Sequence, residues 1–240
     1  MSTLPVRVAA AGGGRRLKLL KVTTFVQGGG TGALDIPYRT ITGNMVLRIL
    51  CGDVAGTVEA PYTITYDIPG ANMAFTQRKV VASAEGSGRP RLIIATLLGA
   101  PVSGEDKNIR LATAASTLSN FSVTVADLPK WWSGAVGNVD GDGTFTTKAS
   151  HTSPSILTSG RNSLLLGIGG CRDGTLGNLA VGGQGGAWRL DAPQLISSVG
   201  QTAAYMGMHL SKLVTRSNAA VDLSVATVSG ADATAWAAGL

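Results

Sequence analysis

The chain has 240 residues, of which 44% are hydrophobic and 14% charged; this is enough apolar material for a packed core and excludes general disorder. Its 33 glycines, with abundant Thr, Ser and Val and few Glu and Lys, favour strands and tight turns over helices. The formal net charge of +6 lies in the first half, where residues 1–120 carry thirteen Lys/Arg against seven Asp/Glu, whereas residues 121–240 carry seven of each. No run approaches the ~18 apolar residues of a membrane-spanning helix, so no transmembrane segment is predicted.

Residues 1–36 are predicted to form a basic N-terminal arm and a first strand. The glycines at 12–14 interrupt any helix, residues 19–27 are rich in β-branched side chains, and the glycine-rich stretch at 28–32 is a plausible hinge. A basic arm contacts either nucleic acid or an acidic protein surface. No aromatic residues are interleaved with its charges, which disfavours nucleic acid. The candidate docking residues are the cations that precede the first acid of the chain: Arg7, Arg15, Arg16, Lys18 and Lys21.

Residues 37–240 are predicted to form one all-β domain, an antiparallel sandwich. Short strand candidates alternate with turn clusters, and several alternate apolar with polar residues, as in 121–125 and 63–66, which predicts one buried and one solvated face. Residues 174–186 are predicted to be a long surface loop, and residues 205–212 a strand, although a weak helical stripe is also present. The remaining candidates are 39–41, 45–51, 73–78, 91–98, 108–112, 155–157, 163–169, 187–190, 194–198, 220–225 and 233–237.

Two apolar runs are the strongest local signals in the chain. Residues 44–53 and 161–171 each place an Asn before four or five residues suited to a buried strand, and Gly and Cys lie at the end of each run. A strand-length apolar run bounded by turn residues is typical of a central strand. Two such runs indicate two facing sheets, with Cys51 and Cys171 as small buried or strand-end residues.

No catalytic constellation is predicted. The histidines, His151 and His209, are expected to be surface or half-buried residues, because neither belongs to a nucleophile elbow or to a Cys/His cluster. The glycine pairs lack the Gly-Lys-Ser/Thr of a phosphate loop. The chain is therefore predicted not to be an enzyme and to need no cofactor, with calcium as the one alternative.

That alternative rests on Asn138, Asp140 and Asp142. Oxygen ligands at alternate positions followed by Gly143 match the first half of a calcium loop. The bidentate Glu expected at the twelfth position is Ala149 instead, so a metal ion needs a ligand from elsewhere. A Gly/Asp turn between two strands is the favoured interpretation.

Trp131 and Trp132 follow Pro129-Lys130 and form the other conspicuous site. Exposed paired aromatics beside a Lys suit a sugar ring or a protein interface. In the alternative interpretation one indole completes the core and the other covers a loop.

The order of these motifs resembles a jelly-roll β-sandwich of bacteriophage virion proteins and bacterial surface proteins. The resemblance runs from Tyr38 to Leu240. It departs from the family in having aliphatics at 92–97, where relatives carry aromatics, and in its extra basic arm. The segments that carry it are 40–50, 63–66 with Met73, 91–98, 108–112, 121–127, 158–166 and the terminal strand with Trp236.

The resemblance implies a structural virion component, either a head decoration or fibre protein or a tail accessory subunit. It would be synthesised in the host cytoplasm, form a homo-oligomer and contact other virion proteins through its arm, without membrane association. A host-surface glycan bound by the loop aromatics is the alternative partner.

Overall fold

The computed structural model describes residues 18–27, 33–53, 63–81, 90–112 and 118–132 of the first half of the chain. In the second half it describes 139–141, 150–152, 156–157, 163–173, 180–182, 187–191, 195–197, 204–214, 220–221, 224–226 and 232–239. These residues form antiparallel strands and no helix, which confirms the prediction of an all-β chain. The predicted arm before residue 18 lies outside the described residues, and the predicted boundary at 36/37 stays a prediction.

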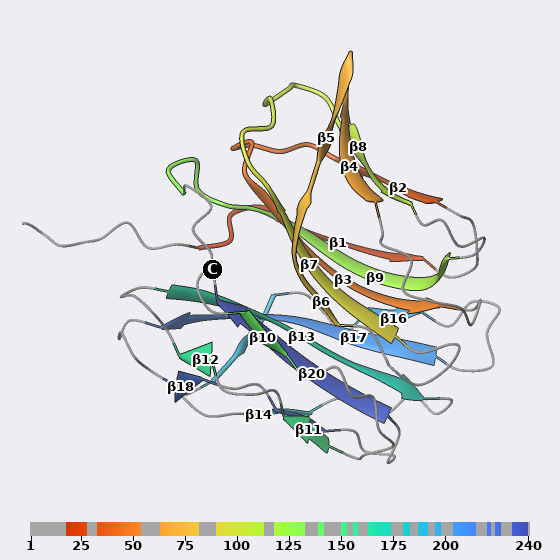
Figure 1. Cartoon of the computed structure of the whole chain (residues 1–240), viewed down its shortest axis with the longest axis vertical. Coiled ribbons are helices and arrows are strands. Elements are labelled where there is room, and N and C mark those ends of the chain that lie inside the picture. Colours follow the sequence, from red (N-terminus) through yellow and green to blue (C-terminus); the bar gives the residue numbers. More distant parts are fainter. Residues whose placement is uncertain are drawn as a thin grey trace, which may run out of the picture.

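The central layer is a five-stranded sheet whose middle strand is β3 (Figure 1). Met45, Leu47 and Ile49 of β3 are buried on one face of this sheet, while Val46 and Leu50 are buried on the other. Apart from Arg48, residues 45–50 of β3 are apolar because both faces of the sheet are covered. In spatial order the strands are β1 (Val22–Gln27), β9 (Leu118–Asp127), β3 (Met45–Asp53), β7 (Pro90–Leu97) and β6 (Thr76–Val81).

A four-stranded sheet covers the first of these faces. Its β2 alternates buried Leu34, Ile36 and Tyr38 with exposed Asp35 and Pro37, the pattern of a sheet with one solvated face. The buried side chains join Met45, Leu47 and Ile49 in one core cluster. In spatial order the strands are β2 (Ala33–Tyr38), β8 (Lys107–Ala112), β4 (Thr63–Ile68) and β5 (Ala71–Ala74).

One stretch of chain passes from the four-stranded to the five-stranded sheet. A turn at Pro69-Gly70 leads into β5, and Gly70 has φ +86°, the left-handed conformation that this turn position requires. The chain then bends at buried Phe75, whose amide donates to the Ile64 carbonyl at 2.8 Å. Beyond it β6 pairs with β7, so β5 and β6 belong to different sheets.

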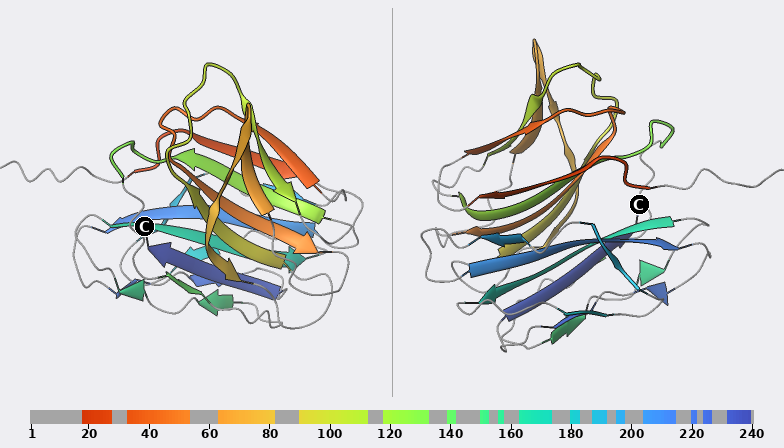
Figure 2. Two further views of the ribbon diagram at one scale, coloured as in Figure 1. Left: turned by 45° about the horizontal axis from the view of Figure 1, so that its top comes forward. Right: turned by 180° about the vertical axis from the view of Figure 1, so that it is seen from behind.

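A six-stranded sheet covers the other face of the central layer, and its middle strand is β13 (Figure 2). Leu164, Leu166 and Ile168 of β13 pack against Val46 and Leu50 of β3. The two apolar runs of the sequence are thus central strands of facing sheets, as predicted. The strands on the main path of this sheet are β10 (Val139–Gly141), β20 (Asp232–Gly239), β13 (Ser163–Asp173), β17 (Ala204–Val214) and β15 (Arg189–Leu190), with β16 (Leu195–Ser197) also paired to β17.

Short strands complete the second half. One small sheet contains β11 (Ser150–Thr152), β19 (Ser224–Ala226) and β14 (Ala180–Gly182), and another pairs β12 (Ile156–Leu157) with β18 (Ala220–Val221). β14 falls inside the segment predicted to be an unbroken loop at 174–186, so that prediction is wrong at 180–182; the rest of the segment lies outside the described residues.

Three further predictions are wrong. Residues 73–78, predicted as one strand, are divided at Phe75 between β5 and β6. Residues 39–41, predicted as a strand, form an irregular turn between β2 and β3. The hydroxyl face of β9, predicted to be solvated, is buried: Ser122 is 3% and Thr124 0% exposed. The six-stranded sheet covers that face, and a pattern of alternation does not reveal a second layer supplied by the other half of the chain.

Candidate interaction site

Three segments meet at one end of the four-stranded and five-stranded sheets. They are residues 39–44, 98–104 and 128–132, and together they are called the rim. The Ala100 amide donates to the Gly43 carbonyl at 2.8 Å, and the Leu128 amide donates to the Asn44 carbonyl at 2.8 Å. Arg39 Nη1 donates to the Gly104 carbonyl at 2.9 Å. The segments come from distant parts of the sequence and are held as one surface by these bonds.

Asn44 is the first of two polar side chains that organise the rim. Its Nδ2 lies within hydrogen-bond distance of the carbonyls of Pro129, Lys130 and Trp132, at 3.3, 3.3 and 3.1 Å. Its Oδ1 accepts from the Gly99 amide at 3.0 Å. One buried amide side chain therefore ties 128–132 to 98–104, and the Asn that precedes the first apolar run has a structural role.

Asp127, at the end of β9, is the second. It is fully buried and accepts hydrogen bonds from the hydroxyls of Tyr38 at 2.8 Å and Thr42 at 3.1 Å, from the Thr40 hydroxyl, and from the Ile41 amide at 3.2 Å. These donors come from the turn at 39–42 and from the end of β2. Burial and the neighbouring Asp127 raise the pKa of Tyr38, which therefore remains a protonated donor.

The turn also needs a glycine at position 43. Gly43 has φ +82°, and a Cβ at this position would lie 2.3 Å from the Ala100 carbonyl oxygen. Both the backbone conformation and the close approach of the neighbouring segment exclude a side chain here.

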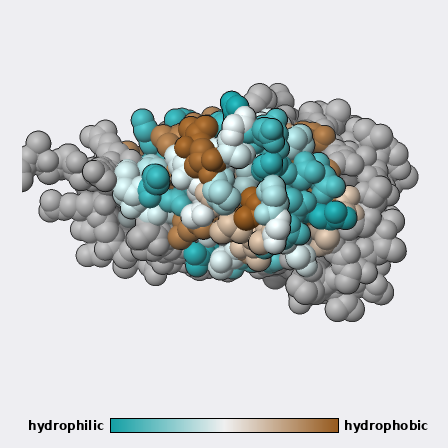
Figure 3. Space-filling model, turned by 90° about the horizontal axis from the view of Figure 1, so that it is seen from above, coloured by the Kyte–Doolittle hydropathy of each residue, from teal (hydrophilic) through white to brown (hydrophobic). Residues whose placement is uncertain are grey.

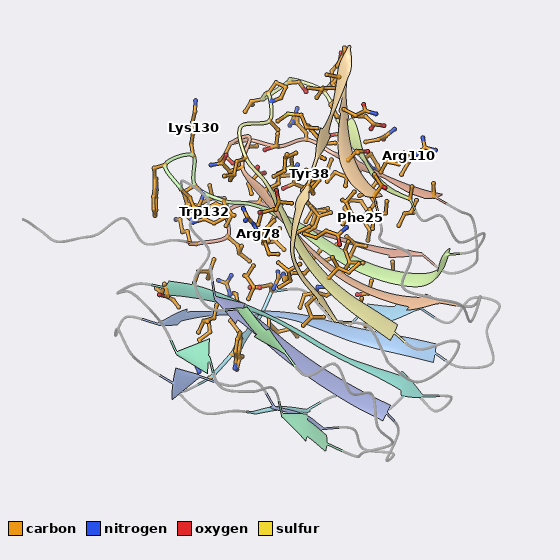
Figure 4. The ribbon with its side chains drawn as sticks, viewed as in Figure 1. Phe25, Tyr38, Arg78, Arg110, Lys130 and Trp132 are labelled. Atoms are coloured by element: carbon orange, nitrogen blue, oxygen red, sulfur yellow. The ribbon has the colours of Figure 1, made fainter. Side chains whose placement is uncertain are left out.

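The outer surface of the rim combines apolar and basic side chains. Ile41 is 52% exposed, Val102 56% and Trp131 42%. Exposed Arg39 and Lys130 belong to the same segments, and Lys130 extends away from the ribbon in Figure 4. Figure 3 shows apolar surface beside hydrophilic surface on the face seen from above.

The base of the predicted arm lies at the same end. The Leu20 amide donates to the Asp127 carbonyl at 2.9 Å, and the Asp127 amide to the Lys21 carbonyl at 3.0 Å. Lys21 Nζ donates to the Arg39 carbonyl at 2.7 Å and lies 4.3 Å from the centre of the Tyr38 ring. Lys18 is exposed. Of the predicted docking residues the structure thus brings Lys18 and Lys21 to the rim; Arg7, Arg15 and Arg16 lie outside the described residues.

The side chains of the two neighbouring tryptophans differ in burial. Trp132 is 7% exposed and packs with Leu19 and Leu128, as in the interpretation that one indole joins the core. Trp131 presents its ring to solvent. Trp132 shares its core cluster with Leu19, which follows the predicted arm, a proximity that sequence spacing did not indicate.

The calcium candidate is not assembled among the described residues. Asp140 lies in β10, opposite Ala237 of β20, while Asn138 and Asp142 lie outside the described residues. In the part of the chain that is described, no group of three or more His, Cys, Asp or Glu residues is placed to hold a metal ion. The calcium loop stays a prediction.

A buried polar cluster lies between the five-stranded and six-stranded sheets. It was not predicted from the sequence. Arg48 of β3 is fully buried; its Nη1 lies 2.7 Å from Asp191 Oδ2 and donates to the Leu210 carbonyl at 2.6 Å. Asp191 also accepts from Ser211 Oγ at 2.6 Å and from Arg189 Nη2 at 2.8 Å. Burial lowers the pKa of Arg48, and Asp191 acts in the opposite direction. A single charge within an apolar run was the available signal, but its partner 143 residues away was not predictable.

His209 belongs to the same interlayer region and is 0% exposed, so the prediction of a surface or half-buried residue is wrong. Burial lowers the pKa of His209 well below its ordinary value, and the charge of Arg48 lowers it further, so the ring is neutral. Its Nε2 lies 2.8 Å from Ser122 Oγ, the spacing of a nucleophile and its base. Both side chains are sealed between the sheets and no acid orients His209 Nδ1, so this pair contributes to packing in the described structure.

Comparisons with known protein families, with curated proteins and with solved structures find no match to this chain. Among the described residues, no helix is long and apolar enough to cross a membrane. The interpretation of the rim therefore rests on its own chemistry.

Proposed function

We propose that the protein is a non-enzymatic structural subunit of a bacteriophage particle, a head decoration or fibre protein or a tail accessory subunit. In this proposal the first half of the chain is a jelly roll, the protein forms a homo-oligomer, and its N-terminal arm docks on neighbouring virion subunits. Residues 18–21, which follow the arm in the sequence, lie at the rim.

The observation that carries the proposal is the nested pairing of the strands. β1 pairs with β9, β2 with β8, β3 with β7 and β4 with β5, all antiparallel. Such nesting, as in a long hairpin rolled into two sheets, supports the jelly-roll assignment. Jelly rolls are common in viral capsid and lectin domains, and this association supports a virion role by analogy.

The anchoring of residues 19 and 20 in the body adds a second line of support. Leu19 is buried in the core cluster and Leu20 is hydrogen-bonded to Asp127, so the body fixes the chain at residues 19 and 20. The cations at 7, 15 and 16 precede this anchor in the sequence. A basic segment that precedes a well hydrogen-bonded rim suits docking on an acidic neighbouring subunit.

The proposal is tested by following the protein through particle purification. The full chain should band with intact particles in a density gradient of lysate from the phage-producing host, and a variant lacking residues 1–17 should stay in the soluble fraction. The deletion ends before residue 19 because removing buried Leu19 would destabilise the body itself. Recovery of the full chain only as soluble protein contradicts the virion role.

A glycan-binding adhesion module is the second candidate, favoured by the exposed Trp131 beside Lys130. A glycan array separates the two functions. Binding that Trp131→Ala abolishes and that deletion of residues 1–17 preserves supports the adhesion module, whereas an array without signal argues against it.

A further inference from the structure

The rim concentrates positive charge where the arm joins the body. Lys18, Lys21, Arg39 and Lys130 all belong to this end. The acids nearest in sequence to segment 98–104 are Glu105 and Asp106, and Glu105 Oε2 lies 3.3 Å from Lys107 Nζ. Together with Lys107 this gives five cations against two acids, so the outer surface is basic.

Large apolar side chains lie within the same three segments. Ile41, Val102 and Trp131 are each between 42% and 56% exposed, so they present much of their apolar surface to water. They are joined through the backbone bonds of 39–44 to 98–104 and through Asn44 to 128–132. Apolar anchors with a surround of charge are the arrangement of a protein–protein interface.

Hydrogen bonds already connect the three segments of the rim in the unbound chain. Asn44 and Asp127 fix the three segments by side-chain bonds to the backbone and to hydroxyls, and Gly43 permits their close approach. A surface that is already ordered loses little conformational entropy on association. The exposed side chains can therefore act as docking anchors.

We infer that the rim is a docking face for an acidic protein surface with an apolar centre, and that Trp131 and Lys130 are its principal contacts. Charge complementarity favours an acidic partner. The exposed aliphatic side chains argue against nucleic acid as that partner. Phosphate backbones are recognised by polar and cationic groups, for which Ile41 and Val102 supply nothing. This inference deepens the proposed docking role by naming the surface of the body that accompanies the arm.

The test measures binding of the full chain to two labelled acidic polymers by fluorescence anisotropy. Poly-L-glutamate supplies charge alone, and a random copolymer of Glu and Tyr supplies charge with apolar anchors. The copolymer should bind more tightly. Trp131→Ala should weaken copolymer binding by about 30-fold, because an aromatic anchor that becomes buried on binding contributes about 2 kcal/mol or more. The affinity for poly-L-glutamate should remain nearly unchanged.

Lys130→Glu should weaken the binding of both polymers by roughly tenfold, since it reverses one charge of the basic surface. Arg110→Glu is the matched charge control, because Arg110 is similarly exposed but lies on β8 opposite Asp35. Val26→Ala is the matched apolar control: Val26 is 43% exposed and lies near the end of β1 away from the rim. Neither control should change the affinity by more than about twofold.

Equal affinity for the two polymers, or equal losses in the control variants, overturns the inference. Tighter binding of a 20-base-pair DNA duplex through the same residues also overturns it, in favour of nucleic acid. The outcome is separable from the proposed function. If the protein bands with particles but rim variants bind both polymers normally, only the docking face is wrong; if the rim binds as expected but no particle contains the protein, only the virion role is wrong.

Discussion

Replacing Arg48 with methionine should show how strongly the six-stranded sheet is fixed to the central layer. The guanidinium is 0% exposed and bridges the layers through Asp191 and the Leu210 carbonyl. Methionine keeps much of the apolar volume but leaves the carbonyl without this donor and Asp191 without its buried cation.

The magnitude follows from what each partner retains. Removing one member of a buried ion pair costs about 3–5 kcal/mol. Asp191 keeps its bonds to Ser211 and Arg189, so we expect Arg48→Met to lie near the lower end, about 3 kcal/mol. Asp191→Leu strands a fully buried cation that keeps only the Leu210 carbonyl, so we expect about 5 kcal/mol.

The double variant should be more stable than Asp191→Leu alone, because replacing both charges removes the uncompensated one. Urea denaturation followed by tryptophan fluorescence gives each free energy of unfolding. Arg110→Met is the control: Arg110 Nε lies 3.9 Å from Asp35 Oδ1, both side chains are about half exposed, and an exposed pair is worth about 0–1 kcal/mol. A cost below about 1 kcal/mol for Arg48→Met, or strict additivity in the double variant, refutes the interlayer bridge.

Three further predictions concern the rim and the interlayer histidine. Gly43→Ala should cost about 3 kcal/mol of folding stability, against about 1 kcal/mol for Gly70→Ala, because both have positive φ but only the first places a Cβ against a backbone carbonyl; equal costs in urea denaturation contradict this. Asn44→Ala should speed trypsin cleavage after Lys130, since it releases the carbonyls of 129, 130 and 132, and an unchanged cleavage rate counts against Asn44 as the organiser. Stability should fall as the pH drops below about 6.5, by about 1.4 kcal/mol at pH 5.5, because unfolded His209 takes up a proton that the buried residue rejects. His209→Gln should reduce this loss whereas His151→Gln should not; equal pH profiles would show that His209 is not its source.

Local patterns were sufficient for most strands of the first half and for the two central strands. They did not predict β2, and they did not predict the break at Phe75 between β5 and β6. β3 and β13 were predictable because most of their consecutive residues are apolar, as is usual for strands buried on both faces. The alternation of Thr63 to Tyr66 likewise matches the exposure along β4. Such patterns require no knowledge of which distant segment provides the cover.

The candidate site was predictable only as separate pieces. The basic residues and the tryptophan pair were visible in the sequence, but their shared position depends on hydrogen bonds between segments that lie more than 80 residues apart, such as Asn44 to Trp132. Thr40 and Thr42 look like strand residues by composition. They bend around Asp127 instead, because a buried carboxylate needs their hydroxyl donors.

The sequence by itself determined the all-β class, the basic N-terminal region and the central strands, because composition and short-range periodicity encode backbone preference and burial. Only the tertiary structure decided that the hydroxyl face of β9 is covered, that Arg48 meets Asp191, and that Leu19 and Trp132 share one core cluster. These features depend on the packing of one half of the chain on the other and on the turns that bring distant segments together. Their physical reason is long-range: a buried polar group must find a partner wherever the fold supplies one.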